Sequence, residues 1–327
     1  MNEFLIGLVG ALIATNQPLA VSNLIQQHTG VSVPVINPDD PEAKALDQVM
    51  AQDDAAMDEV DKWIRDNNAF AAQNAGESKE TLNQRIRARL DSVRKGYEDF
   101  LQRYPNSARG HLAYGTFLND TGNEEAAADE YQKSAQLDPK NPAVWNNLAN
   151  YCGEHGPITN AFADYARAIA LDPTESLYYR NLATTVYLFR RDARAYYGIS
   201  EAEVFDKSLA LYRQAMQLAP QDFLLAADYA ESYYGIRPLR TNDALTAWTN
   251  ALQIARDDNE REGVYIHLAR IKWSAGRFAE ASAQLEGVTN PAFADARHRI
   301  ERLIAKSENA ATNPPAGVST NAPNRTP

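Results

Sequence analysis

The sequence is poor in cysteine, glycine and proline, and it has no long run of positive charge. Its 327 residues include a single cysteine, Cys152, so no intramolecular disulfide can form. The formal net charge is −11, without any Lys/Arg-rich stripe, which disfavours nucleic acid as a partner because phosphates are negative. With 44% hydrophobic residues the chain can still bury a core of ordinary size. These features exclude a disulfide-stapled scaffold and argue against a DNA- or RNA-binding protein.

Sequence signatures of common enzymes are also missing. No GxxxxGK[ST], GxGxxG, HExxH or GxSxG motif occurs in the chain. Cys152 and His155 form a C-x-x-H pair, but no second pair with matching spacing completes the four ligands of a zinc site. Cys152 also falls at a core position of its helical pattern. We therefore expect no enzymatic activity, no metal and no cofactor.

The prolines that are present recur at regular distances. Four of them are separated by 34, 34 and 47 residues: Pro105, Pro139, Pro173 and Pro220. A period near 34 is typical of helical repeat arrays. Residues 108–141 and 142–175 each contain two apolar-periodic halves around a central glycine, Gly122 or Gly156. Glycine suits a tight turn between helices, and the closing proline ends the second helix.

These units resemble the tetratricopeptide-repeat (TPR) family, whose helix pairs carry large, small and aromatic residues at set positions. The first unit matches that pattern with His111, Tyr114, Gly115, Ala127, Tyr131, Ser134 and Pro139. The second matches it with Trp145, Leu148, Ala149, Ala161, Tyr165, Ala168 and Pro173. In this family the small residues allow close helix approach and the aromatic residue fills the gap to the next pair. The resemblance implies an all-α protein, a right-handed α-solenoid of about five TPR helix pairs with flanking helices.

The rest of the chain is divided on the same basis. We expect the TPR array over residues 107–290, with an insertion near 189–206 in the third unit. An N-terminal helical region with a divergent unit is expected at 43–106, and a capping helix at 291–306. Residues 307–327 are rich in Asn, Pro, Ala, Ser and Thr, which predicts a disordered tail.

The N-terminal segment, residues 1–22, contains an apolar run at 4–14 and precedes an expected linker at 23–42. The run is short for a membrane span and resembles the core of a signal peptide. However, the residues before it lack Lys and Arg and include Glu3, which argues against a signal peptide. The sequence leaves two interpretations open: export or membrane association through residues 4–14, and a short docked helix in a cytoplasmic chain.

The TPR resemblance also implies a binding face, because the family lines its concave groove with residues of the first helices. In the later units the groove positions hold Asn146, Asn150, Arg180, Thr184, Tyr187, Glu231, Tyr234, Arg270 and Trp273. Further groove positions hold Arg109, Thr116, Asn119, Asp120 and Glu154. Asparagine amides can bond a peptide backbone, arginine can bind a carboxylate, and aromatic rings add rigid contact area. The alternative is that these polar residues only solvate the groove. The set does not match the carboxylate clamp of chaperone-binding TPR proteins.

The insertion places Arg190, Arg191 and Arg194 beside Tyr196 and Tyr197. It is either a second contact for an acidic partner or a helical extension packed on its own unit. The sequence as a whole predicts a non-catalytic scaffold that binds a protein or peptide partner in its groove. The alternatives are a cell-envelope assembly factor attached by the N-terminal segment, and a regulatory subunit of an enzyme complex. The sequence indicates neither the identity of the partner nor the oligomeric state.

Overall fold

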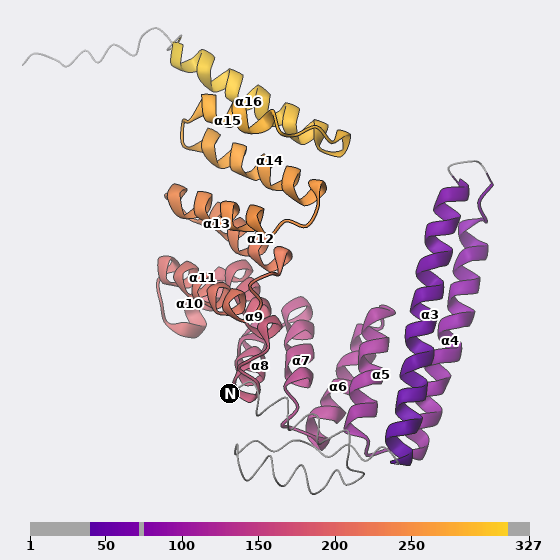
Figure 1. Ribbon diagram of the computed structural model, residues 1–327. Coiled ribbons are helices and arrows are strands. Elements are labelled where there is room, and N and C mark those ends of the chain that lie inside the picture. Colours follow the sequence, from indigo (N-terminus) through magenta and orange to yellow (C-terminus); the bar gives the residue numbers. More distant parts are fainter. Residues whose placement is uncertain (1–39, 72–74, 313–327) are drawn as a thin grey trace, which may run out of the picture. The chain divides into compact units, whose positions relative to one another are not determined.

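The computed structural model describes residues 40–71 and 75–312 of the chain. Within these ranges every regular element is helical, with fourteen α-helices and two 3-10 helices (Figure 1). None of the described helices combines the length and the apolar character that a membrane crossing requires. The expected N-terminal segment, most of the linker and the last part of the tail lie outside the described residues. The helices form two compact units, which meet in sequence at Lys140 and Asn141 and are described separately.

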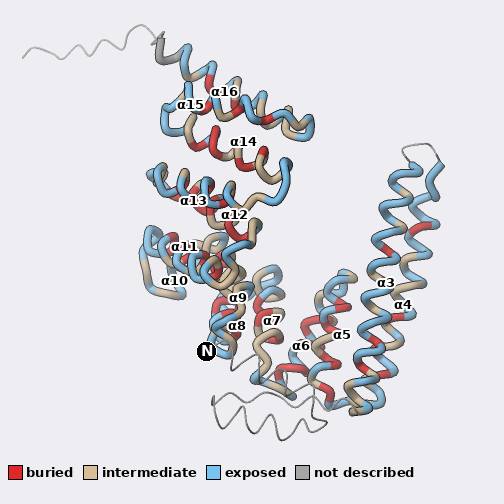
Figure 2. Tube along the Cα trace, in the orientation of Figure 1, coloured by how far each residue is buried: buried red, intermediate tan, exposed pale blue. Residues whose placement is uncertain are grey.

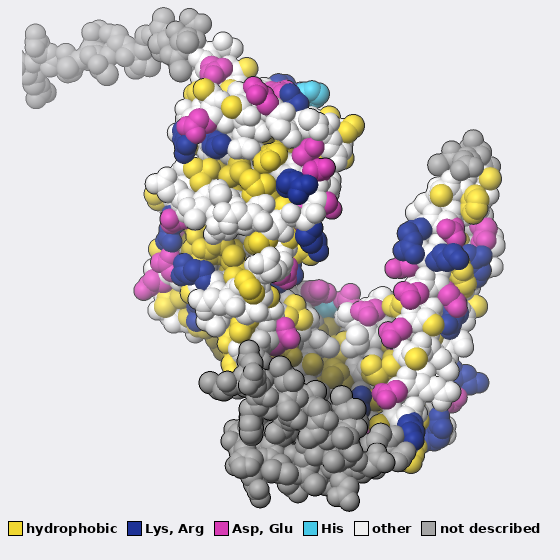
Figure 3. All heavy atoms as spheres, viewed as in Figure 1, with side chains coloured by type: hydrophobic (Ala, Val, Ile, Leu, Met, Phe, Trp, Pro, Cys, Tyr) yellow, Lys and Arg dark blue, Asp and Glu magenta, His cyan; other side chains and the backbone are white. Residues whose placement is uncertain are grey.

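Unit 1 begins with a long helical hairpin, α3 (Pro41–Ala71) and α4 (Lys79–Arg103). The two helices pack through buried apolar residues, among them Leu46, Val60 and Val93. Figure 3 shows acidic and basic side chains interspersed over the visible face of this hairpin. Such a mixed surface is that of solvated helices. The divergent unit expected at 43–106 is therefore a hairpin of 31- and 25-residue helices, longer than the helices of the following pairs.

The first regular pair is α5 (Ala108–Asp120) and α6 (Glu124–Leu137). These two helices cross closely at Gly115, where a Cβ atom would lie 2.6 Å from the Tyr131 ring and 3.2 Å from the Ala127 carbonyl oxygen. Gly122 has a φ of +80° in the turn between them, a conformation that favours glycine. The Tyr97 ring of α4 stacks on Tyr114 with 5.4 Å between ring centroids. The small, aromatic and turn positions of the TPR pattern thus have the packing roles that the resemblance implies.

Unit 2 contains four further helix pairs and a final helix, arranged in sequence order in Figure 1. The pairs are α7 (Pro142–His155) with α8 (Ile158–Leu171), α9 (Ser176–Leu188) with α11 (Glu201–Leu218), α12 (Phe223–Glu231) with α13 (Thr241–Gln253), and α14 (Asp258–Ser274) with α15 (Phe278–Leu285). Figure 2 shows the buried positions along the facing sides of the helices. Alanines at these positions, such as Ala149, Ala161 and Ala183, are completely buried. Together with α5 and α6 these pairs make the five that the sequence predicts.

The insertion in the third unit forms a short helix of its own, α10 (Arg190–Tyr197). Ala193 is completely buried beneath it. The rings of Tyr196 and Tyr197 lie 5.2 and 5.6 Å from the ring of Phe162 on α8, measured between centroids. A capping box between Ser200 and Glu203 then starts α11. The insertion is therefore a helical extension packed on its own unit and also on the preceding pair.

The fourth pair departs from the regular form. Its first helix, α12, is short and continues into the 3-10 helix η1 (Ser232–Gly235). Five residues from Ile236 to Arg240 follow before α13, and they include a cis peptide bond between Arg237 and Pro238. This connection is longer than those of the pairs α5–α6, α7–α8 and α14–α15.

The helix boundaries differ from the expected ones at the C-terminal end. After the 3-10 helix η2 (Pro291–Phe293), the capping helix α16 runs from Ala294 to Thr312. Residues 307–312, which we expected in the tail, are therefore helical. Ser307 explains the difference, because its hydroxyl accepts a hydrogen bond from Trp273 Nε1 at 3.1 Å and donates one to the Leu303 carbonyl at 2.9 Å. The tail composition gives no sign of this contact.

Candidate functional site

A cavity of 310 Å³ opens on unit 2 between its second and third helix pairs. Its lining comes from α9, α11, α12 and η1, and consists of Thr184, Tyr187, Leu188, Tyr212, Asp228, Glu231, Ser232 and Tyr234. Four of these residues are among the groove residues predicted from the sequence: Thr184, Tyr187, Glu231 and Tyr234. The cavity thus lies on the face of unit 2 formed by the first helices α7, α9, α12 and α14, which we call the first-helix face.

The α9 wall of the cavity is fixed by hydrogen bonds and by one close backbone approach. The Thr184 hydroxyl lies 2.8 Å from the Tyr212 hydroxyl and donates to the Arg180 carbonyl oxygen at 3.0 Å. The Tyr187 ring extends over Gly235 of η1, where a Cβ atom would lie 2.6 Å from the Tyr187 hydroxyl oxygen. Glycine at position 235 therefore gives the Tyr187 ring its place in the wall.

The α12 wall carries two carboxylates in different states. Asp228 forms an ion pair with Arg180, whose Nε and Nη2 atoms both lie 2.7 Å from Oδ2. Glu231 has no such partner among the described residues, and its nearest basic atom is Nε2 of His267 at 4.0 Å. Partial burial, and then the Asp228 carboxylate, raise the pKa of Glu231, whereas Arg270 acts in the opposite direction. The cavity therefore presents one carboxylate that is already neutralised and one that is open to a donor.

Tyr234 connects the cavity to the next helix pair. Its hydroxyl lies 3.1 Å from Nδ1 of His267, and the Arg270 guanidinium lies 4.4 Å above its ring. The His267 ring stacks on Trp248 with 4.0 Å between centroids. Burial, and the nearby Arg270, lower the pKa of His267 to about 4, so this imidazole is neutral at neutral pH. Arg270 thus supports the cavity wall from outside.

Three of the predicted groove residues serve other contacts. Asn146 is buried and its side-chain oxygen accepts from Asn181 at 2.9 Å, so little of it faces a ligand. The Asn150 oxygen accepts from the Tyr165 hydroxyl at 2.6 Å, although the residue itself is exposed. Trp273 packs against α16 and donates to Ser307. These residues do not line the cavity.

The sequence prediction missed four lining residues: Leu188, Tyr212, Asp228 and Ser232. Leu188 holds a groove position of the third unit but is apolar, and 61% of it is exposed. Its position in the repeat would have identified it. Tyr212 occupies the aromatic position of the second helix α11, which the repeat pattern places in the core. Asp228 and Ser232 lie outside the groove positions, and the short α12 and η1 bring them to the cavity.

In unit 1, two of the predicted groove residues contact other residues of the same unit. Arg109 lies 3.6 Å from the Asp47 carboxylate on α3, and the Thr116 hydroxyl donates to the Leu112 carbonyl. Asn119 and Asp120 are exposed at the end of α5.

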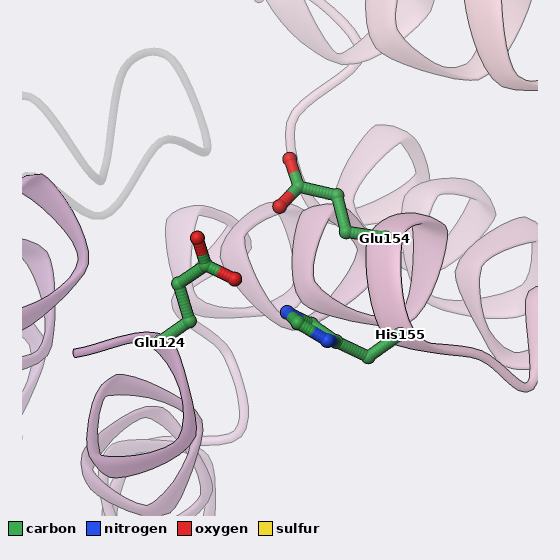
Figure 4. Close-up of side chains that lie close together, drawn as sticks. All are labelled: Glu124, Glu154 and His155. Atoms are coloured by element: carbon green, nitrogen blue, oxygen red, sulfur yellow. The ribbon is translucent and has the colours of Figure 1, made fainter. Parts of the chain in front are cut away.

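The C-x-x-H pair lies at the end of α7. Cys152 is half-buried against the core around Phe162 and Tyr165. Burial raises the pKa of its thiol, so the reactive thiolate form is disfavoured. Figure 4 shows Glu154 and His155 at adjacent positions of the helix end, and both are exposed. The packing of Cys152 agrees with the core position that the sequence indicates.

Comparison with protein-family profiles gives no match, and comparison with curated protein sequences gives none either. Among solved structures, the chain is similar to the C-terminal part of a TPR repeat-containing protein from Cytophaga hutchinsonii. The TM-score is 0.51 at 14% identity, over 78% of this chain and 98% of that one. It is also similar to Pseudomonas aeruginosa PilF, with a TM-score of 0.48 at 16% identity, over 76% of this chain and 98% of that one.

A third similar structure is YrrB, described as a TPR protein with an unusual peptide-binding site. Its TM-score is 0.47 at 12% identity, over 65% of this chain and 97% of that one. Identities this low bear on the fold alone. The similarity to the Cytophaga hutchinsonii structure agrees with the paired helices seen in both units. Its fold is that of tetratricopeptide-repeat structures, an all-α array of paired helices.

Proposed function

We propose that unit 2 is a non-catalytic scaffold that binds an extended segment of a protein partner across its first-helix face. One side chain of that segment occupies the 310 Å³ cavity. The observation that carries this proposal is the convergence of α9, α12 and η1 on the cavity. Two successive helix pairs thereby place four groove residues around one opening that has room for a large side chain.

The chemistry of the lining suits binding better than catalysis. The hydroxyls of Thr184 and Ser232 donate to backbone carbonyls at 3.0 and 2.9 Å, so neither is positioned against a general base. The Tyr212 hydroxyl is 2.8 Å from the Thr184 hydroxyl. These contacts orient the rings and hydroxyls and leave them as contact surface, as in many peptide-recognition sites.

The open carboxylate of Glu231 indicates what the cavity prefers. A carboxylate that has no basic partner and lies near the Asp228 carboxylate gains most from a group that donates N–H bonds. The surrounding tyrosine rings can contact the apolar part of such a side chain, and they attract a cation. The proposed occupant is therefore a long side chain that ends in N–H donors, such as lysine, arginine or glutamine.

The test starts from the full chain and a displayed library of random 12-residue peptides. Enriched peptides are synthesised with a fluorescein label, and their Kd values are measured by fluorescence anisotropy. Leu188→Asp changes an exposed residue that lines the cavity. Leu171→Asp is the matched control, because Leu171 is an exposed leucine at the end of α8, a second helix that does not form the first-helix face.

We expect Leu188→Asp to weaken binding at least tenfold, since it places a charge in the contact surface, and Leu171→Asp to leave the Kd unchanged. Equal affinities for the two variants would refute the cavity as the site. A library that yields no enriched peptide would refute peptide binding by this chain.

A further inference from the structure

A second cavity of 310 Å³ lies on unit 2 beside the insertion helix α10. It is lined by Leu188, Phe189, Arg190, Arg191, Asp192, Arg194 and Glu201. Leu188 therefore belongs to the lining of both cavities, and its exposed side chain stands between them. A single extended segment, which advances about 3.3 Å per residue, can place successive side chains on either side of Leu188.

The three arginines that line this second cavity differ in whether they bind other residues of the protein. Arg190 is engaged within the protein, because its Nη1 donates to the Tyr187 carbonyl at 3.0 Å and its guanidinium lies 5.5 Å from the rings of both Tyr187 and Phe205. Its Nε also lies 3.9 Å from the Glu201 carboxylate. In the part of the chain that the structure describes, the guanidinium groups of Arg191 and Arg194 make no hydrogen bond or ion pair.

Arg191 and Arg194 are presented on a fixed support. They are three residues apart on α10 and therefore lie on neighbouring positions of one helix face. The opposite side of α10 is anchored by the buried Ala193 and by the contact of Tyr197 with Phe162. Gly198, in the left-handed conformation, ends the helix. Two unpaired arginines on an anchored helix require little ordering to bind a ligand.

We infer that the segment bound on the first-helix face carries carboxylate side chains next to the residue in the first cavity, and that these bind Arg191 and Arg194. This inference rests on the proposed function and adds the class of the partner, an acidic protein segment. The lining holds three arginines against the two carboxylates of Asp192 and Glu201, in a chain whose net charge is −11. An acidic ligand is complementary to this excess, and arginine binds carboxylates in bidentate geometry.

The experiment uses the fluorescein-labelled peptides selected on the full chain. The variant Arg191→Gln/Arg194→Gln removes both guanidinium groups. The matched control is Arg299→Gln/Arg302→Gln, which removes two exposed arginines at the same spacing on α16 and changes the net charge equally. On the peptide side, each Asp or Glu is replaced by Asn or Gln, which requires no change in the protein.

We expect the selected peptides to be enriched in Asp and Glu over the library. The Kd should rise about tenfold in Arg191→Gln/Arg194→Gln, and it should be unchanged in the α16 control. A double-mutant cycle between the acidic peptide residue and the arginines should show coupling, because a paired contact is not additive. Added salt should weaken wild-type binding more than binding by the α10 variant.

Selected peptides without an excess of Asp and Glu would overturn the inference. Equal losses of affinity in the two double variants would also overturn it, because they would indicate a long-range effect of net charge. If binding still depends on Leu188, the proposed function survives in those cases. The absence of any enriched peptide, or binding that Leu188→Asp does not change, would instead refute the proposed function and with it this inference.

Discussion

Nδ1 of His111 lies 2.5 Å from a carboxylate oxygen of Glu130, and both side chains are buried between α5 and α6. Nε2 of the same ring lies 3.0 Å from the Pro105 carbonyl oxygen. Both ring nitrogens thus face acceptors, an arrangement that suits the protonated imidazolium. The bond to Glu130 raises the pKa of His111 above its ordinary value, while burial of the ring and, less strongly, Lys133 oppose this rise in part.

This contact predicts a loss of stability on the alkaline side. Because the folded pKa of His111 exceeds the unfolded value near 6.5, its contribution is fully present below pH 6.5 and is lost as pH rises through the folded pKa. The titration of the ring should be visible by NMR as a midpoint above 6.5. In His111→Gln, the unfolding midpoint in urea should lose this part of its pH dependence. A midpoint at or below 6.5 would contradict the prediction.

His267 should behave in the opposite way. Its folded pKa of about 4 lies below the unfolded value near 6.5, so its contribution is fully present above pH 6.5 and falls as pH decreases toward 4. The ring is faced or adjoined by four residues: Tyr234, Trp248, Glu231 and Arg270. Only Glu231 among them carries a negative charge that would favour an imidazolium. NMR should show this histidine still neutral at pH 5.5. Peptide binding should weaken as the pH falls toward 4, since a protonated Nδ1 can no longer accept a hydrogen bond from the Tyr234 hydroxyl.

Two glycines inside helices provide a matched test of the helix crossing. Gly115→Ala should lower the free energy of unfolding by about 1–3 kcal/mol, because the new Cβ would overlap the Tyr131 ring. Gly153→Ala on α7 has no atom within 4 Å of the new Cβ and should be stabilising by about 0.5–1 kcal/mol. The denaturant midpoints of the two variants, compared with that of the wild type, would show these opposite changes in stability. Similar effects in the two variants would mean that α5 and α6 do not cross at Gly115.

Gly235→Ala tests the shape of the first cavity. The new methyl group would collide with the outer end of the Tyr187 ring, which can move without disturbing the backbone. We therefore expect a small change in the thermal midpoint and a severalfold increase in the Kd of the selected peptides. The double variant Gly235→Ala/Tyr187→Ala removes the collision. It should bind no more weakly than Tyr187→Ala alone, and a further loss would contradict this explanation.

The end of α16 can be tested by truncation. A chain ending at residue 306, the predicted boundary, lacks Ser307 and leaves Trp273 Nε1 without its acceptor. A chain ending at residue 312 retains it. We expect the shorter chain to have the lower thermal midpoint and faster amide exchange in α16, because a half-buried donor loses its acceptor. Identical thermal midpoints would show that residues 307–312 do not contribute to the stability of the fold.

Much of the fold could be predicted from the sequence because its signals are local and repeated. The 34-residue spacing, the closing prolines and the small residues, such as Gly115 and Ala161, act within one or two adjacent helices. These contacts identify helix pairs without knowledge of the rest of the chain. The continuation of α16 depends instead on Trp273, 34 residues before Ser307, and tail composition does not reveal such a contact.

The cavity was predicted only in part for a related reason. The repeat positions identified Thr184, Tyr187, Glu231 and Tyr234. Asp228 and Ser232 reach the lining because α12 is short and continues as η1, and this local change of helix type has no clear sequence signal. The opposite holds for Asn146, which its position in the repeat assigns to the groove. Its hydrogen bond with Asn181 of the next helix pair leaves little of this side chain free to contact a ligand.

The packing of α10 on α8 has a consequence for how unit 2 unfolds. In a regular solenoid each helix pair contacts its neighbours through one interface, so pairs can open one after another. Here Tyr196 and Tyr197 add a second interface between the first two pairs of unit 2. We expect α7 to α11 to open as one cooperative block, with similar hydrogen-exchange protection, and the pairs after α11 to open more independently. The insertion would then make the α9 wall of the cavity open less often than the α12 wall.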